Sequence, residues 1–549
     1  MGNKVGYISV ILPLKLGWEP YYALPEGVEA AIGDRVRVLF AGRLYLGVVS
    51  EIGVRPSARA VPKIREIREI VKEKERIALS EIAFWRELST YYMCSVGEVF
   101  KAAYTAAKDK EVKARGKEKT VAEAAESQAA LSEIHLDNAD NELLSSLEAK
   151  MSPGSKLLLS SERQELLLEA LCRKKENTNI LWLVPEKKFE KAMLERLEAA
   201  FGDRLVVWDS DLTPARKRKA AERVRSGRPY VVFGTRSALF LPHRDLGLVI
   251  VQDEHESSYK QSSPAPRYNG RDAALILASI FKSACILTSL TPSLETVYNC
   301  TTGKYVALGN GSPKKPAFVV VDTAKELRKN GMIGDISRKL VEAASGSFAV
   351  YKPRRAAFPK MEELENQVSE AFGKNVFITD DLIEKPVPQD IEMLAVFGVD
   401  AMLGRQDFRA DERVCQIISN AVNLCPDTLK TVVIQTREAG HSVFSAIQSG
   451  SLTPLMDERK EFSLPPYTRL MDVAVVDSIQ ERGRSMCERL AALIGQYAPV
   501  LRGSGVIRVT LARDRKLPSV KQAIKTAVET VEREEKYPGH IYFDVDPVI

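Results

Sequence analysis

Two long stretches of this chain alternate short apolar runs with charged segments of helical length, and this alternation limits the folds available to it. In residues 151–310 the apolar runs are LLLS, NILWLVP, LVVW, YVVFGT, LGLVIVQDE and ACILTSLTPS. Continuous apolar runs of this kind are typical of buried strands, and helices between them connect parallel neighbours. Residues 311–440 repeat the pattern more weakly, with AFVVVD, SFAVYKP, NVFITDD, EMLAVFGVD and TVVIQT. We therefore expect two successive α/β lobes.

The segments on either side of these lobes have different patterns. Residues 5–50 alternate short apolar runs with turns at Gly33–Asp34 and Ala41–Gly42, which predicts a small β-barrel-like unit. Residues 76–104 read as two helices broken near Cys94–Ser95, and residues 465–549 as a small α+β domain. Between the first helices and the first lobe, the chain is rich in Ala, Glu and Lys and nearly free of aromatics, which favours a linker or a weakly packed helical segment.

The composition sets few limits on function. The chain has 549 residues, 45% hydrophobic and 28% charged, as in ordinary globular proteins. It has no run of eighteen apolar residues, and its start reads as a strand interrupted by Pro13 and Lys15, so we expect a cytoplasmic protein without membrane contact. Seven scattered cysteines without a CxxC pair predict reduced thiols and no zinc. A formal charge of +6 permits nucleic-acid binding without arguing for it.

A set of longer motifs runs in order along nearly the whole chain. It comprises LPEGVEAAIGDRVRVLF with GVVSEI, WRELSTYYMCSVGEVFKAA, GTRSALFLP, DEHESSYKQ, LTSLTPSLET, QDFRADER, LPPYTRL and DVDP. Single pieces such as YYMC are ordinary packing patterns, but the ordered set resembles the PriA family of primosomal replication-restart helicases (primosomal protein N′, superfamily 2). The resemblance implies a multidomain α/β fold with a small N-terminal β-rich domain, two RecA-like parallel-sheet helicase lobes and a small C-terminal α+β domain. The expected units are a 3′-DNA-end-binding domain (1–105), a linker or vestigial winged helix (106–150), helicase-like lobe 1 (151–310), a truncated lobe 2 without its zinc element (311–464) and the C-terminal domain (465–549).

The nucleotide-binding signals of that family are missing. An ATPase of this kind needs GxxxxGK[ST], whose backbone amides and Lys hold the phosphates. After the strand KLLLS, this chain instead has a short loop, Ser161–Glu165, with no glycine and two carboxylates. The family's Asp-Glu-Glu-His reads Gln252, Asp253, Glu254 and His255 here, which removes the metal-holding Asp. A one-residue slip, with Asp253–Glu254 as the acidic pair, is the alternative alignment.

Two further parts of the family's machinery are also missing. After DFRADER the chain reads QIISNAVNLC, where the family carries arginine fingers. After YKPRRAAFPK no cysteine follows for about sixty residues, so the zinc element is expected to be deleted. ATP, Mg and Zn are therefore expected in intact members and not here, and no catalytic residue is assigned.

The resemblance also suggests residues that contact DNA. In the N-terminal domain the candidates are Tyr21, for stacking on a terminal base, and Arg65, for a phosphate. In lobe 1 they are Arg236 and Ser237 of GTRSALF and Lys260 of SSYKQ. For each residue an ordinary structural role is an equal or stronger alternative: strand packing for Tyr21 and a solvated charge for Arg65.

These observations favour a shortened, degenerate PriA-like protein that binds branched or 3′-ended DNA in replication restart or primosome assembly, without ATPase or helicase activity. Single-strand-binding protein and primosome components are its expected protein partners. One alternative is an active ATP-dependent 3′–5′ DNA helicase with an unrecognised nucleotide site. Another is a primosome interaction scaffold that does not bind DNA.

Overall fold

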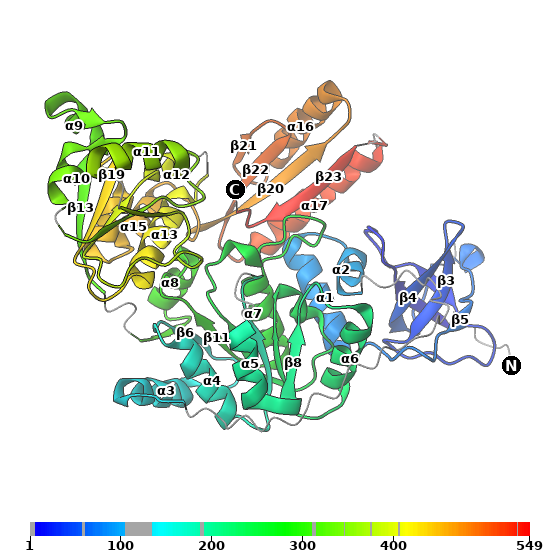
Figure 1. Cartoon of the computed structure of the whole chain (residues 1–549). Coiled ribbons are helices and arrows are strands. Elements are labelled where there is room, and N and C mark those ends of the chain that lie inside the picture. The colour runs from blue at the N-terminus through cyan, green and yellow to red at the C-terminus, as the bar shows by residue number, and fades with distance from the viewer. Residues whose placement is uncertain are drawn as a thin grey trace.

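The computed structural model describes residues 6–57, 61–104, 134–186, 191–309, 314–344, 346–373, 376–404, 407–534, 536–537 and 539–548. Four larger β-sheets divide these residues into a small N-terminal domain, two α/β lobes and a C-terminal domain (Figure 1). The expected linker at 106–150 lies outside the described residues as far as residue 133. No helix of the described residues is long and apolar enough to span a bilayer.

The N-terminal domain is a five-stranded antiparallel sheet that closes on itself. Its strand order is β2-β1-β4-β3-β5, and the two edges meet where Ala23 pairs with Glu66 and the Ala23 amide donates to the Arg65 carbonyl at 3.0 Å. Branched side chains such as Ile8, Val36 and Val49 fill the interior. The predicted barrel-like unit is thus confirmed. Its strands are β1 (Tyr7–Ile11), β2 (Tyr21–Ala23), β3 (Arg35–Phe40), β4 (Arg43–Ile52) and β5 (Glu69–Ile70).

Two helices follow the barrel and pack on lobe 1. Helix α1 (Leu79–Tyr92) ends at Met93 in the left-handed conformation, and α2 (Val96–Ala103) starts at Ser95, whose hydroxyl accepts from the Glu98 amide. Ser and Glu three residues apart form a capping box, which explains the predicted break near Cys94–Ser95. Helix α1 contacts α7, so the same apolar core continues from the N-terminal helices into lobe 1.

Lobe 1 is a seven-stranded parallel sheet of order β12-β6-β11-β10-β7-β9-β8, covered by helices. Six of its strands are the six apolar runs expected from the sequence. The strands are β6 (Lys156–Leu159), β7 (Asn179–Leu183), β8 (Leu205–Trp208), β9 (Val231–Gly234), β10 (Leu246–Val251), β11 (Ala284–Thr288) and β12 (Val306–Leu308). The helices are α3 (Asn138–Lys150), α4 (Gln164–Lys174), α5 (Lys191–Phe201), α6 (Pro214–Arg225), α7 (Gly270–Phe281) and α8 (Leu294–Thr301), with short 3₁₀ turns η3 (Gly202–Arg204), η4 (Arg236–Phe240) and η5 (Ser257–Tyr259).

Helix α3 belongs to this lobe although it lies in the segment expected to be a linker. Leu144 and Leu147 are buried in the lobe-1 core, and α3 packs against α4. Its start is fixed by Asp137, whose carboxylate accepts from the Asp140 amide at 2.8 Å. The described part of the linker segment is thus a packed helix, because two leucines three positions apart share one helix face.

Lobe 2 is a second parallel sheet, of order β13-β19-β18-β16-β17, and confirms the second α/β lobe. Its strands are β13 (Ala317–Asp322), β16 (Phe348–Tyr351), β17 (Phe377–Thr379), β18 (Met393–Val396) and β19 (Thr431–Thr436), beside a small hairpin of β14 (Met332–Ile333) and β15 (Ile336–Ser337). The helices are α9 (Thr323–Lys329), α10 (Arg338–Ala343), α11 (Met361–Phe372), α12 (Val399–Leu403), α13 (Ala410–Leu424), α14 (Ser442–Ser449) and α15 (Thr453–Glu461).

The C-terminal domain is a four-stranded antiparallel sheet, β21-β22-β20-β23, with two helices, as the sequence predicts. Its elements are β20 (Thr468–Val476), α16 (Gln480–Ile494), β21 (Val500–Arg502), β22 (Val506–Ala512), α17 (Leu517–Glu534) and β23 (His540–Val545). This domain returns to lobe 1, where Lys260 is ion-paired with Asp544 at 2.6 Å. Helix α1, which follows the barrel, and the C-terminal domain therefore both pack on lobe 1.

Candidate functional site

A cavity of about 1280 Å³ lies where the two lobes and the C-terminal domain meet. Its wall includes the start of α4, the segment after β10, the start of α13 and the segment before β20. In a parallel sheet the carboxyl ends of the strands are where ligands bind. The segments expected to hold nucleotide line this cavity, so their contacts decide what it can bind.

The loop between β6 and α4 lines the cavity and is folded on itself. The amides of Arg163 and Gln164 donate to the hydroxyl and the carbonyl of Ser161, at 3.1 and 3.2 Å. The Arg163 guanidinium reaches outward to Asp137 at 3.2 Å and also to Asp140, ahead of and within α3. Two of the backbone amides that would cradle a phosphate in a glycine-rich loop are thus occupied.

The side chains at the start of α4 are hydrogen-bonded to residues 252–255, Gln-Asp-Glu-His, which we call the acidic-box remnant. Nε2 of Gln164 donates to Oδ1 of Asp253 at 2.9 Å. Nε2 of Gln252 donates to Oε1 of Glu165 at 2.8 Å, while its Oε1 accepts from the Trp182 indole at 3.0 Å. Gln252 is fully buried, and an aspartate there would face the Glu165 carboxylate. The amide is therefore the side chain that fits this position.

The other two residues of the remnant, Glu254 and His255, bond to neighbouring segments at the carboxyl ends of the strands. Glu254 is 2% exposed and accepts from the Arg271 guanidinium at 3.0 Å and from the Ser293 amide at 2.7 Å. His255 bonds the Ser289 hydroxyl through Nδ1 at 2.7 Å and lies 3.4 Å from the amide nitrogen of Asn420. Asn420 belongs to α13, in the segment where the family's arginine fingers are expected, so an uncharged amide of lobe 2 lies against His255.

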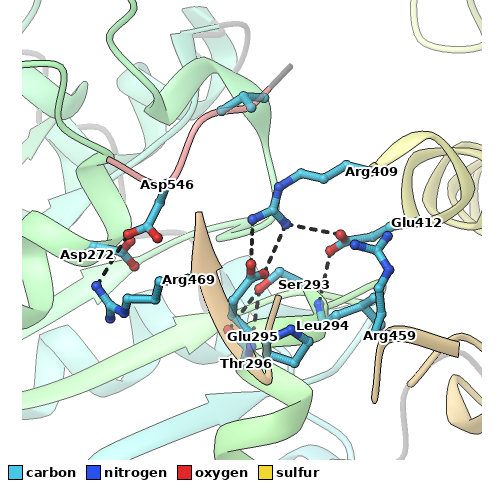
Figure 2. Close-up of polar contacts among 12 residues, drawn as sticks. Asp272, Ser293, Leu294, Glu295, Thr296, Arg409, Glu412, Arg459, Arg469 and Asp546 are labelled. Carbon is cyan, nitrogen blue, oxygen red and sulfur yellow. Dashed lines mark hydrogen bonds and ion pairs between the residues drawn. The ribbon is translucent and has the colours of Figure 1, made fainter. Parts of the chain in front are cut away.

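A buried charge cluster joins the two lobes across the same cavity (Figure 2). Arg409, just ahead of α13, reaches Glu295 of α8 at 3.2 Å and Glu412 at 3.1 Å, and Glu412 also accepts from the Leu294 amide at 3.0 Å. Arg459 of α15, 1% exposed, pairs with Asp411 at 2.6 Å. The segments that carry this cluster are LTSLTPSLET and QDFRADER, so they act here as the lobe–lobe contact.

Burial and charge act in opposite directions on the carboxyls of this cluster. Burial alone would raise the pKa of Glu295, but the charge and hydrogen bonds of Arg409 outweigh it, so that pKa lies well below its ordinary value. Burial raises the pKa of Glu412 above its ordinary value despite the attraction of Arg409. Arg409 is therefore held mainly by Glu295, with Glu412 as a second partner.

The start of α4 presents carboxylates where the phosphates of a nucleotide would lie. A triphosphate there would meet Glu165 and Asp253, both already bonded to neighbouring amides. Arg196, a cation of the same wall, pairs with Glu169 at 2.7 Å. Among the described residues no cluster of three or more His, Cys, Asp or Glu could hold a metal ion. All seven cysteines are described, and none forms a disulfide.

The candidate DNA residues of lobe 1 have internal partners. Lys260 is 9% exposed. Its ammonium group donates three hydrogen bonds, to the carboxylate of Asp544 and to the carbonyls of Arg267 and Val545. A lysine has three donors, so this geometry does not support a DNA contact by Lys260. Arg236 bonds the Lys260 carbonyl at 3.2 Å and the Ser258 carbonyl, and Ser237 accepts from the Trp208 indole at 3.0 Å. These two hold the turn after β9 in place.

The candidate residues of the barrel are exposed and lie on paired segments. Tyr21 is 42% exposed in β2. Arg65 is exposed beside that strand, next to the bridge between Ala23 and Glu66. Burial raises the pKa of Tyr22 to about 12, and the positive charge of Arg65 opposes that shift, which places Arg65 close to Tyr22. The structure thus brings Tyr21 and Arg65 to the same edge of the barrel.

Trp18 is a further exposed aromatic of the barrel that the sequence patterns do not single out. It lies between β1 and β2, is 60% exposed, and its ring centroid is 6.3 Å from that of Phe40. By contrast Trp85 and Trp182 are buried. An indole in a loop ahead of Tyr21 was the available signal, but sequence alone does not distinguish an exposed tryptophan from a core one.

Two parallel-sheet lobes joined through strand-end segments, with a closed antiparallel barrel on one side, define the class: a protein with a helicase-like fold. Residues 9–105 match the family model of the 3′DNA-binding domain (3′BD) of PriA. Replication restart protein PriA of Treponema pallidum (strain Nichols) is 25% identical, over 95% of this chain and 95% of its own length. Residues 9–105 are thus similar to the 3′DNA-binding domain of PriA, and the chain as a whole is similar to replication restart protein PriA over nearly its full length.

Other relatives match part of the chain. Replication restart protein PriA of Rickettsia conorii (strain ATCC VR-613 / Malish 7) is 30% identical over 360 residues, 62% of this chain and 51% of the relative. This chain spans about half the length of the Rickettsia relatives. Among solved structures, the DUF1998 helicase MrfA bound to DNA covers 73% of this chain and 60% of its own, with 13% identity and a TM-score of 0.36.

Proposed function

We propose that this protein binds branched or 3′-ended DNA during replication restart and does not hydrolyse ATP. The match of residues 9–105 to PriA's 3′DNA-binding domain carries the DNA-binding part of the proposal. The exposed side chains of Trp18, Tyr21 and Arg65 on that barrel support it, because aromatic rings stack on bases and guanidinium groups bind phosphates.

The loss of ATP turnover is argued from the cavity. The phosphate loop is replaced by a short self-bonded turn, and the acidic box is paired with Gln164 and Glu165. Removal of a single arginine finger typically costs about 10³-fold or more in phosphoryl transfer, and here an asparagine occupies that region. We propose neither zinc nor Mg–nucleotide as a cofactor. The protein partners we propose are single-strand-binding protein and primosome components. We also propose a cytoplasmic location.

The DNA-binding part is tested by fluorescence anisotropy with forks that carry or lack a free 3′ strand. Tyr21→Ala should weaken binding to the 3′-ended fork by about 5- to 150-fold, since stacking on one base is worth about 1–3 kcal/mol. Tyr21→Phe keeps the ring and should retain binding. Arg65→Ala should weaken both forks equally, because a phosphate contact carries no end or base information.

Arg328→Ala, an exposed arginine of α9, is the matched control and should bind as wild type. If wild-type protein bound neither fork at low salt, the DNA-binding proposal would be wrong. If both forks bound and Tyr21→Ala and Arg65→Ala matched wild type, these two residues would be excluded and the proposal itself retained.

A further inference from the structure

Helix α6 of lobe 1 and the turn after it form a strongly basic surface. Residues 214–228 read PARKRKAAERVRSGR, with seven arginines and lysines and one acid, Glu222. The helix has no acidic residue in its first turn, and four cations follow one another at 216–219. Apart from Val224 its side chains are exposed or half-buried. This density of one charge on one helix is suited to an anionic partner.

Three of the seven cations have structural roles. Lys217 donates to the Ser210 carbonyl at 2.7 Å, and Arg223 bonds the carbonyls of Asp203 and Pro229. Arg225 pairs with Glu75 at 2.8 Å. The other four are Arg216, Arg218, Lys219 and Arg228, all exposed, and within the described ranges no residue forms an ion pair with them. These four define the α6 basic face.

The α6 basic face works against the stability of its own helix. Cations near a helix N-terminus oppose the helix dipole, and like charges three or four positions apart repel one another. A merely solvated face would carry both signs, as α9 does with Lys325, Glu326 and Arg328. An anionic ligand along the helix would offset both costs, which favours a binding role over a solvated surface.

An ion pair joins α6 to the chain that follows the barrel. Arg225 of α6 pairs with Glu75, in the segment after β5. Residues 65–75 expose Arg65, Arg68 and Lys72 among the carboxylates of Glu66, Glu69, Glu73 and Glu75, so the cations of the barrel and of α6 are two separate groups. Figure 1 shows α6 on the side of lobe 1 that faces the barrel. A DNA ligand held at the barrel therefore has the α6 basic face as a second cationic surface on the same side of lobe 1.

We propose that the α6 basic face binds the phosphate backbone of the duplex arm that adjoins the 3′ end held by the barrel. This inference rests on the proposed DNA-binding function and adds a second contact surface to it. Helix α6 has twelve residues, so it is about 18 Å long, which matches about five base pairs of duplex. Its sequence has no aromatic residue, whereas sites for single strands combine cations with stacking rings. The duplex backbone is therefore the form of DNA that fits it.

The test is the salt dependence of binding by the full chain to a fork with a long duplex arm. The variant is Arg216→Gln, Arg218→Gln, Lys219→Gln and Arg228→Gln together; glutamine is a good helix former, so the helix is retained. Each phosphate neutralised contributes about 0.9 to the slope of log K against log salt, so the slope should fall in magnitude by up to about 3.6. The loss should be smaller on a 3′-ended single strand of the same length.

The matched control changes four exposed cations of lobe 2 to glutamine: Arg328, Lys329, Arg338 and Lys360. It alters net charge by the same amount and should leave the salt slope near wild type. If the α6 variant and the control behaved alike, the inference would be overturned while the barrel site could still stand, as shown by a persistent effect of Tyr21→Ala. A wild-type protein that bound no fork would instead overturn the proposed function, and the α6 inference with it.

Discussion

At the scale of single residues, the acidic-box remnant separates what the sequence could give from what only the fold shows. The sequence alone shows that Gln252 has lost the charge of an aspartate. It does not show that Gln252 meets Glu165, because 87 residues separate them and only the parallel order of β6, β11 and β10 brings them together. For Lys260, the sequence SSYKQ suggests a phosphate contact. The structure instead pairs Lys260 with Asp544, which lies 284 residues away along the chain.

The Gln252–Glu165 pair makes a prediction of its own. Gln252→Glu places a second carboxylate against Glu165 in a buried position and should destabilise the protein by about 1–3 kcal/mol. The added change Glu165→Gln returns one amide and one carboxylate to the pair and should recover most of that loss. Urea unfolding of the two single variants and the double variant measures the coupling. Additive losses, with no recovery in the double variant, would show that the two side chains do not depend on each other.

At the scale of elements, buried strands were predictable and short edge strands were not. The eleven longer apolar runs of the two lobes are all strands, and most of these strands, such as β7, β10 and β18, are buried on both faces, which demands a continuous apolar sequence. Strands such as β2, β5 and β12 have only two or three residues and carry no such pattern. Helix α3 was missed as part of lobe 1 because its two buried leucines lie within an otherwise charged sequence.

The contact between α8 and the segment before α13 predicts how strongly the lobes are joined. Arg409→Ala leaves Glu295 and Glu412 buried without their cation and should destabilise the protein by about 3–5 kcal/mol. The exposed Arg328→Ala should change stability by no more than about 0.5 kcal/mol. Thermal unfolding of both variants at pH 7 checks this, and equal midpoints would contradict it.

The same contact has a defined pH dependence. The pKa of Glu295 is held below its ordinary value by Arg409. The ion pair between these two residues therefore stabilises the folded state at neutral pH, and this stabilisation is lost progressively as the pH falls below about 4.3. The difference between wild type and Arg409→Ala should therefore narrow on acidification. In the variant, Glu295 and Glu412 lack the positive charge of Arg409, so they become protonated at a higher pH than in wild type. Protonation removes the cost of burying an unpaired carboxylate. Urea unfolding of both proteins at pH 7 and at about pH 4 measures the two differences in unfolding free energy, and an unchanged difference would contradict this prediction.

At the scale of the whole molecule, a DNA-end domain, two joined lobes and a C-terminal domain surround a cavity whose nucleotide-facing groups bond one another. Helix α1 packs on α7 of lobe 1, and Asp544 of the C-terminal domain pairs with Lys260 of lobe 1. The two lobes are in contact with each other, while the segments expected to hold phosphate and the arginine fingers carry other side chains. These features support the proposal of a DNA-binding protein that does not hydrolyse ATP.

The most direct test of this account is the rate of ATP hydrolysis by the purified full chain, with and without saturating forked DNA. Active phosphoryl-transfer enzymes turn over at about 1–100 s⁻¹. The account predicts no turnover above that of a mock preparation under either condition, in a sample that binds the fork. The account would be contradicted by fork-stimulated turnover in the active range that is present in the wild type and absent from an identically purified cavity variant such as Asp253→Ala.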